Sequence, residues 1–488
     1  MTFNSAGFLI FFPVVLLLYF LLPKKLTWIW LLAASYWFYM SWNRDLVFLI
    51  LFTTAVSYSG GLVIEKSRSA AVKKASLAVT VVSSLGVLFF FKYFNFLTGT
   101  LNRIFALFGG GSPLPALDLI LPVGISFYTF QTLSYAIDVY RGKIAAERHF
   151  GYYALYVSFF PQLVAGPIER PENLLPQLRE KHPLRMDDAL AGLKKMVVGF
   201  FKKVVVADML APLADGVFAS PAEASGAAVL LACLAFTVQI YCDFSGYTDI
   251  AIGCARIMGI RLMQNFDLPY GARSIKEFWA KWHISLSSWF RDYLYIPLGG
   301  NRCSRARHLC NLMTVFLVSG LWHGASWHFV LWGGLHGLYQ VIGILTRKPK
   351  DRLLDLIGIK KDGRFYRAVQ RVTTFLLVAF AWLLFRADST ADMLTLAGRL
   401  FTAWTAGSAA SSYAFFGSDP AKILLCAASV FVMALMDRSE HSDSAAASQT
   451  GFNAAKLVPY LAAVWVIAFS WINLQASGGS GTFIYFQF

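Results

Sequence analysis

The sequence predicts an all-α, polytopic membrane protein. Of its 488 residues, 57% are hydrophobic and only 14% are charged. The apolar residues come in runs of about 15 to 22, close to the length that an α-helix needs to cross the hydrocarbon core of a bilayer. Helices suit that environment because they pair every backbone group within one segment. We expect about 11–13 transmembrane or re-entrant helices, with interfacial amphipathic helices beside them.

The apolar runs can be followed along the chain in order. They cover residues 8–22, 28–42, 46–64, 77–96, 119–140, 152–165, 189–218, 227–260, 309–322, 327–345, 372–385, 393–404, 423–436 and 457–471. Pro122 and Gly124 interrupt the fifth run and predict a kink or a re-entrant segment. Polar connections are expected at residues 169–188, where Glu169 and Arg170 should make a polar contact, and at residues 347–371 and 437–449. We expect one membrane domain over residues 1–488, with N-terminal spans in 1–110, a motif-bearing core in 115–345 and C-terminal spans in 372–488.

The formal net charge of +16 comes largely from short basic clusters between the apolar runs. Lys24 and Lys25 follow the first run, and Lys66 and Arg68 follow the third. Positively charged loops stay in the cytoplasm, so this pattern places the N-terminus outside. It favours membrane topology over nucleic-acid binding as the reason for the charge. The six cysteines show neither metal-ligand spacing nor a disulfide pattern.

Residues 274–298 combine tryptophans at three-to-four spacing with charged side chains, as in Trp279, Trp282 and Trp289. This pattern predicts one amphipathic helix in the membrane interface. His283 lies on the predicted helix, with Ser287 one turn further on. From the residues alone, the pattern favours anchoring of this histidine at the headgroup level, and a position facing a tunnel is the alternative.

His323 follows the run 309–322, which is only about 21 Å long as a helix, against roughly 30 Å of hydrocarbon. The imidazole should therefore lie inside the membrane. Desolvation favours its neutral form, which a general base requires. Gly324 would let a substrate approach closely. Position alone slightly favours the alternative, a histidine that hydrogen-bonds a neighbouring helix.

Asp243 and Asp249 are acids within an apolar run. Intramembrane acids are costly and usually have a partner. Their six-residue spacing separates them around a helix, so they do not form a matched acid–base pair. We expect a structural role, with Arg256 or the region of Lys276 as partner.

Several ordered motifs resemble the membrane-bound O-acyltransferase family, in its alginate O-acetylation branch. The longest are residues 241–250 (YCDFSGYTDI), 278–287 (FWAKWHISLS), 289–300 (WFRDYLYIPLGG) and 321–324 (LWHG). Shorter matches are residues 121–126, 160–167, 385–387 and 483–488. The resemblance therefore runs nearly from end to end.

The resemblance implies a helical bundle with a central tunnel in the bacterial cytoplasmic (inner) membrane. It makes His323 the catalytic histidine and His283 the second motif histidine. The supporting or tunnel-lining candidates are Trp322, Gly324, Trp282, Ser287, Asp243 and Asp249. It further implies a cytoplasmic acyl thioester donor, acetyl-CoA or an acyl carrier protein, with no metal and no tightly bound cofactor. Membrane lipids and an extracytoplasmic acetyltransferase or polysaccharide-modifying protein are the expected partners.

The expected activity is transfer of an acyl group, most simply acetyl, across the membrane for O-acetylation of an exopolysaccharide such as alginate. Alternatives within the family are D-alanyl transfer to teichoic acid and acylation of a lipid or protein. An alternative from another class is a transporter that moves an acyl donor or a polymer without bond chemistry. The chain shows no internal repeat, which counts mildly against the transporter.

Overall fold

The computed structural model describes residues 1–488 except 112, 165, 405–419, 446–457 and 477–488. The described residues form helices and no β-strand, which confirms the all-α class. They divide into two compact units. The first comprises residues 1–196 and 247–263, and the second comprises residues 197–246 and 264–488. The single membrane domain over residues 1–488 stays a prediction.

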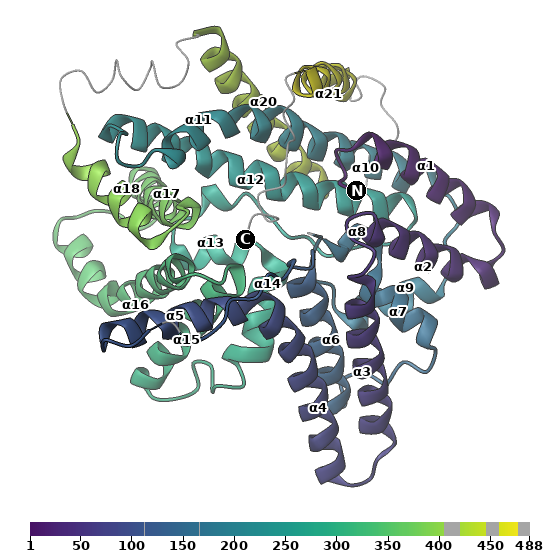
Figure 1. The fold of residues 1–488 in the computed structure, drawn as a ribbon. Helices are drawn as coiled ribbons and strands as arrows, with labels where there is room; N and C mark the ends of the chain where they lie inside the picture. The colour runs from purple at the N-terminus through teal and green to yellow at the C-terminus, as the bar shows by residue number, and fades with distance from the viewer. Residues whose placement is uncertain (112, 165, 405–419, 446–457, 477–488) are drawn as a thin grey trace. The chain divides into compact units, whose positions relative to one another are not determined.

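The first unit is built mainly from the N-terminal helices. They are α1 (Ala6–Leu21), α2 (Lys24–Met40), α3 (Val47–Lys66), α4 (Ala70–Leu88), α5 (Phe94–Leu107), α6 (Ile125–Tyr140), α7 (Phe150–Ser158), α8 (Phe160–Leu163), α9 (Pro171–Arg179) and most of α10 (Met186–Phe200). A π-helical segment, Phe89–Tyr93, joins α4 to α5. Helices α3, α4 and α6 pack side by side (Figure 1).

The predicted run 119–140 is helical only from Ile125 onward. Gly124 has a left-handed backbone with a φ of 75°, and a Cβ atom there would lie 2.6 Å from the carbonyl oxygen of Leu163. Only glycine fits this conformation and this space without strain. The interruption predicted from Pro122 and Gly124 is thus confirmed, and α6 begins directly after it.

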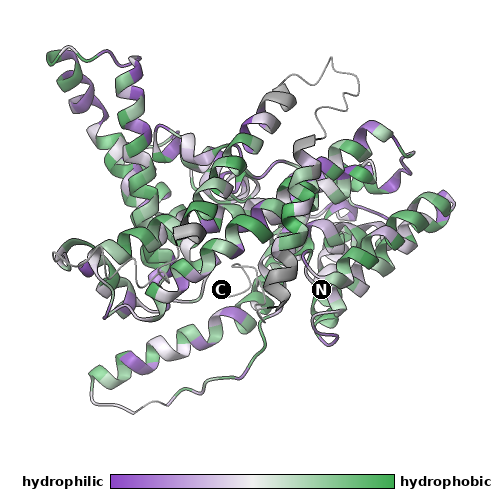
Figure 2. Cartoon of the chain, turned by 90° about the horizontal axis from the view of Figure 1, so that it is seen from above, coloured by the Kyte–Doolittle hydropathy of each residue, from purple (hydrophilic) through white to green (hydrophobic). Residues whose placement is uncertain are grey.

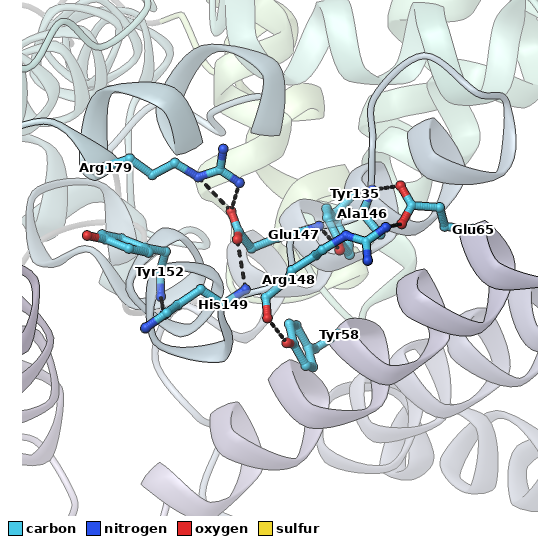
Figure 3. A network of polar contacts seen from close by, with 9 residues as sticks. All are labelled: Tyr58, Glu65, Tyr135, Ala146, Glu147, Arg148, His149, Tyr152 and Arg179. Atoms are coloured by element: carbon cyan, nitrogen blue, oxygen red, sulfur yellow. Dashed lines mark hydrogen bonds and ion pairs between the residues drawn. The ribbon is translucent and has the colours of Figure 1, made fainter.

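Figure 3 shows how the loop before α7 is held in the first unit. Glu65 accepts hydrogen bonds from the backbone N–H of Ala146, at 3.0 Å, and from the guanidinium of Arg148, at 2.9 Å. The buried carboxylate of Glu147 accepts from Arg179 of α9. These contacts join α3 and α9 through one short segment, because Glu65 and Arg179 belong to these two helices.

A second buried carboxylate ties the start of α9 to the segment after α12. Glu169 accepts from the backbone N–H of Met263 and, at 2.7 Å, from the side chain of Asn173. Burial raises the pKa of Glu169 to about 7, although these two hydrogen bonds and the charge of Arg170 lower it. The polar contact expected at Glu169 is present. The connection expected over residues 169–188 contains a helix that was not predicted, α9.

The second unit begins with the last residues of α10, followed by a π-helical segment, η2 (Phe201–Ala207), and further helices. They are α11 (Asp208–Ala219), α12 (Gly226–Ile257, whose last residues belong to the first unit), α13 (Ile275–Lys281), α14 (Ile284–Phe290), α15 (Arg305–His323), α16 (Trp327–Leu356), α17 (Arg364–Arg386), α18 (Thr390–Thr402), α20 (Pro420–Ala445) and α21 (Val458–Ala476). A short 3-10 helix, η3 (Pro269–Gly271), precedes α13, and a π-helical segment, η4 (Arg291–Tyr295), follows α14.

Three predicted elements differ from the structure. Residues 274–298 do not form one helix, because the chain breaks between α13 and α14 at Trp282 and His283. The predicted loops at 347–371 and 437–449 are partly helical, since α16 continues to Leu356, α17 starts at Arg364 and α20 continues to Ala445. Lys, Arg, Glu and Ala are good helix formers, so a helix can continue beyond the point where its apolar run ends.

Five helices within the described residues are long and apolar enough to cross a membrane: Val47–Lys66, Ala70–Leu107, Gly226–Ile257, Trp327–Leu356 and Arg364–Arg386. Figure 2 shows mostly apolar helices with hydrophilic residues in the connecting turns. Large apolar side chains such as Ile10, Phe48 and Val82 are exposed, as lipid-facing residues are. The protein is a multi-pass membrane protein.

Candidate active site

The site lies in the second unit, where His323 ends α15 at a sharp turn into α16. The two helices pack with their backbones in contact. A Cβ atom on Gly320 would lie 2.2 Å from the carbonyl oxygen of Phe329, and one on Gly333 would lie 2.2 Å from that of Phe316. Small residues allow this close approach. The turn therefore holds His323 on a rigid helical hairpin.

The His323 side chain is buried among aromatic rings. Its ring centroid lies 5.0 Å from Trp322, 5.0 Å from Trp332 and 5.6 Å from Phe385, with the ring planes close to perpendicular. Only 5% of the residue is exposed. These rings shield the imidazole almost completely from the surroundings of the protein.

The space beside Gly324 is filled by Phe329. A Cβ atom on Gly324 would lie 2.1 Å from two carbons of the Phe329 ring. The glycine therefore makes room for this ring at the turn between α15 and α16. The structure shows a packing reason for Gly324 where the sequence suggested close approach of a substrate.

His283 occupies the break between α13 and α14 and has a φ of 46°. A non-glycine residue in this region costs on the order of 1–3 kcal/mol and persists only where its surroundings enforce it. Here the backbone N–H of Ile284 donates to the carbonyl oxygen of Asn265 at 2.9 Å. The side chain of Ser287 closes the turn by donating to the carbonyl oxygen of Trp282.

Asn265 fixes which nitrogen of His283 carries the proton. Its side-chain oxygen Oδ1 accepts from the backbone N–H of Ser285, at 3.1 Å, and from the Ser285 hydroxyl, at 2.9 Å. The same oxygen lies 3.2 Å from His283 Nδ1. An amide oxygen can only accept, so Nδ1 donates and Nε2 is the acceptor nitrogen of the neutral ring.

His283 is completely buried and lies outside the helices that can span a membrane. Burial lowers its pKa to about 3. The ring is therefore neutral at physiological pH.

The two histidines share one aromatic neighbour. The Trp322 ring centroid lies 6.0 Å from that of His283 and 5.0 Å from that of His323. Trp382 makes further ring contacts beside them. Its ring centroid lies 4.9 Å from that of Trp282 and 5.6 Å from that of Trp332. The structure thus brings together Trp282 and His283 from one motif with Trp322 and His323 from another, 39 or more positions further along the chain, in one aromatic enclosure.

The two acids of the predicted site lie in different surroundings. Asp243 is buried and pairs with Lys203 of η2 at 2.5 Å, and Lys203 also pairs with Asp208 at 2.9 Å. Asp249 belongs to the first unit and pairs with Lys195 at 2.8 Å. The expected pairing with Arg256 is wrong, because Arg256 pairs with Asp188. The pattern of the largely apolar run 189–218 does not indicate that Lys195 and Lys203 pair with these acids.

A second buried pair lies beside the first. Lys202 pairs with Asp437 of α20 at 2.6 Å, and the Tyr241 hydroxyl donates to the same carboxylate at 2.7 Å. The Tyr241 ring also contacts Trp282, with 6.2 Å between centroids. These contacts connect η2 and α20 to the wall of the aromatic enclosure.

Other buried histidines have partners that hold them in place. Trp279 donates to His336 at 3.2 Å, and His328 lies 2.9 Å from the Ser326 hydroxyl. Across the described part of the chain, no three His, Cys, Asp or Glu side chains gather in a group that could hold a metal ion. His336 also contacts Trp332 of the enclosure, with 5.0 Å between ring centroids, whereas His323 and His283 both contact Trp322.

Residues 144–386, which include both histidines and the aromatic enclosure, match the model of the membrane-bound O-acyltransferase family. The chain belongs to this family, and it is a membrane O-acyltransferase. The terminal motif, residues 483–488, lies outside the described residues.

Several similar proteins are named as O-acetylases or O-acetyltransferases. The chain is 42% identical to the probable alginate O-acetylase of Azotobacter vinelandii, over 83% of this chain and 78% of that protein. It is 43% identical to the probable alginate O-acetylase of Pseudomonas aeruginosa, over 83% and 74%. It is 35% identical to the peptidoglycan O-acetyltransferase of Helicobacter pylori, over 79% and 77%.

Proposed function

We propose that this enzyme passes an acetyl group from a cytoplasmic thioester donor, acetyl-CoA or an acyl carrier protein, across the bacterial inner membrane to a hydroxyl acceptor. The acetyl group serves O-acetylation of an exopolysaccharide such as alginate, through a separate extracytoplasmic transferase. The N-terminus lies outside the cytoplasm. The observation that carries this proposal is the aromatic enclosure in which His323 and His283 share Trp322.

In this mechanism His323 is the general base. It takes the proton from the acceptor hydroxyl while the hydroxyl oxygen attacks the thioester carbonyl carbon. The C–S bond then breaks, and the protonated His323 returns the proton to the leaving thiolate. The products are an ester and a free thiol, and the histidine is neutral again.

His283 orients the acceptor. Because Asn265 holds the proton on Nδ1, the acceptor nitrogen Nε2 can receive a hydrogen bond from a hydroxyl. A positioned general base such as His323 accelerates a reaction by about 10²- to 10⁴-fold, which corresponds to roughly 3 to 5 kcal/mol of activation free energy. The aromatic walls exclude water, which limits hydrolysis of the thioester.

Peptidoglycan is the second candidate for the acetylated polymer. The relative with that name is 35% identical to this chain, against 42% and 43% for the two probable alginate O-acetylases. Both candidates use the same acetyl transfer and differ in the final acceptor. The higher identities favour the exopolysaccharide.

The test uses purified protein in liposomes, with an acetyl thioester labelled in the acetyl group supplied on one side. Acyl transfer releases free thiol on the donor side and moves the label to a hydroxyl acceptor. Delivery of intact thioester to the other side would contradict the proposal and indicate a transporter. A preference for D-alanyl over acetyl thioester would contradict the proposed acyl group.

A further inference from the structure

The hairpin of α15 and α16 carries a groove at the end opposite His323. The two helices lie side by side (Figure 1). Helix α15 ends at His323, and α16 begins at Trp327, just after the turn. Helix α15 has 19 residues, and over the same length α16 reaches Leu345. Arg305, the first residue of α15, therefore lies at the level of Leu345. A groove of about 830 Å³ is lined by Arg305 and by α16 from Ile344 to Leu356.

The groove lies where α16 leaves the membrane. Helix α16 has 30 residues and is about 45 Å long, whereas roughly 20 residues cross the hydrocarbon core. The apolar part of α16 ends at Leu345 and basic residues follow from Arg347, so the helix passes from the hydrocarbon to the headgroups at about this point. The groove therefore lies at the boundary between the lipid tails and the headgroups.

The groove combines positive charge with apolar surface. It is lined by four cationic side chains: Arg305, Arg347, Lys348 and Arg352. The other lining residues are apolar, and Leu345, Leu353 and Leu356 are exposed. No carboxylate is among the lining residues, although Asp351 and Asp355 belong to the same helix.

The four cations are available to a ligand. In the part of the chain that the structure describes, no ion pair or side-chain hydrogen bond involves any of them. By contrast, the nearby Lys361 pairs with Asp355 at 2.9 Å. Clustered guanidinium groups prefer phosphate, to which they can donate two parallel hydrogen bonds.

We propose that this groove binds an anionic phospholipid, such as phosphatidylglycerol or cardiolipin. The phosphate lies among Arg305, Arg347 and Arg352, and the start of an acyl chain lies on the leucines. Basic pockets between helices at the cytoplasmic interface suit such headgroups. The volume falls within the range of about 300 to 1,000 Å³ that is usual for ligand sites. This inference does not depend on the reaction at His323.

The experiment counts bound lipid by native mass spectrometry of the purified protein, with phosphatidylglycerol and phosphatidylcholine offered in equal amounts. The wild type should retain phosphatidylglycerol preferentially. The double variant Arg347→Gln/Arg352→Gln should bind it about tenfold or more weakly, because each basic group at the surface contributes to the affinity. The matched control Lys73→Gln/Lys74→Gln removes two charges from the start of α4 and should bind like the wild type.

Equal retention of the two lipids by the wild type would overturn the proposal. An unchanged affinity in Arg347→Gln/Arg352→Gln would also overturn it. Displacement of phosphatidylglycerol by free coenzyme A in solution would assign the groove to a soluble phosphate ligand instead. Thermal unfolding of each variant in detergent shows whether the protein that has lost lipid is still folded. The Arg305→Gln variant is measured in the same way.

Discussion

Asn265 controls His283 through a single oxygen atom. That oxygen contacts His283 Nδ1 and accepts two hydrogen bonds from Ser285, so it determines both the tautomer and the position of the ring. The unusual φ of His283 depends on the same residue, because the backbone of Asn265 accepts from Ile284. The geometry thus makes Asn265 a positioning residue that acts through His283.

The variant Asn265→Ala should lower kcat by about 10- to 100-fold, since small errors in the placement of a reacting group can cost about 10²-fold. It should also cost about 1–3 kcal/mol of stability, because a buried N–H loses its acceptor. Rates are measured per folded molecule in the liposome assay. Ser285→Ala, which leaves the contact between Asn265 and His283, should remain within about twofold of the wild type. A folded Asn265→Ala enzyme with the kcat of the wild type would rule out this role.

Glu169 should make the stability of the protein depend on pH. The unfolded chain loses the Glu169 proton near its usual pKa of 4.5, whereas the folded chain keeps it up to about pH 7. Between these values the folded state binds more protons, so the contribution of Glu169 to stability falls as the pH rises and is constant above this window.

The variant Glu169→Gln keeps an acceptor for Met263 and has no charge to bury. Its melting temperature in detergent, relative to that of the wild type, should therefore rise from pH 4.5 to pH 7 and then level off. Parallel curves for the two proteins across this range would contradict the assignment.

At the scale of elements, the packing of α15 against α16 should be sensitive to a single methyl group. Gly320→Ala places a Cβ atom 2.2 Å from the carbonyl oxygen of Phe329, and a backbone atom cannot move aside as a side chain can. The expected cost is about 1–3 kcal/mol, seen as a lower melting temperature. In Gly343→Ala, on the same hairpin, the new methyl group meets no atom within 4 Å and should leave the melting temperature unchanged or raise it. Equal effects of the two substitutions would refute the close contact.

The buried charges that join η2, α11 and α12 should also be essential for stability. Lys203→Met leaves Asp243 and Asp208 without this lysine, at a cost of about 3–5 kcal/mol. Thermal unfolding in detergent measures the loss. The control Lys361→Met removes one member of an exposed pair and should not change the midpoint. A Lys203→Met protein as stable as the wild type would show that the buried pairs contribute little.

Much of the fold could be predicted from the sequence, because long apolar runs have few alternatives to helices in a membrane. The break at Trp282 and His283 could not. A histidine with positive φ has no signature in a sequence, and the tryptophan spacing on both sides of it suits one continuous helix. The helical ends of α16 and α20 were missed for a different reason: their polar residues match those of loops, although they also tolerate a helix.

The site could be predicted only in part. His323 and His283 stood out through their motifs, and both lie in the enclosure. Asn265 carries no motif signal, and its role depends on a contact across 18 residues. The partner of Asp243 was equally hidden, because Lys203 is buried by the π-helical turn of η2 and looks like a topology-setting cation in the sequence.

At the scale of the whole molecule, the central claim is that a multi-pass membrane protein carries out acyl transfer at one buried imidazole. The most direct test is the rate of thiol release from an acetyl thioester by His323→Ala in liposomes. We expect the rate per folded molecule to fall by about 10²- to 10⁴-fold. His308→Ala, which removes a histidine from the other end of α15, should stay within about twofold of the wild type. A folded His323→Ala protein that releases thiol at the wild-type rate would contradict the account.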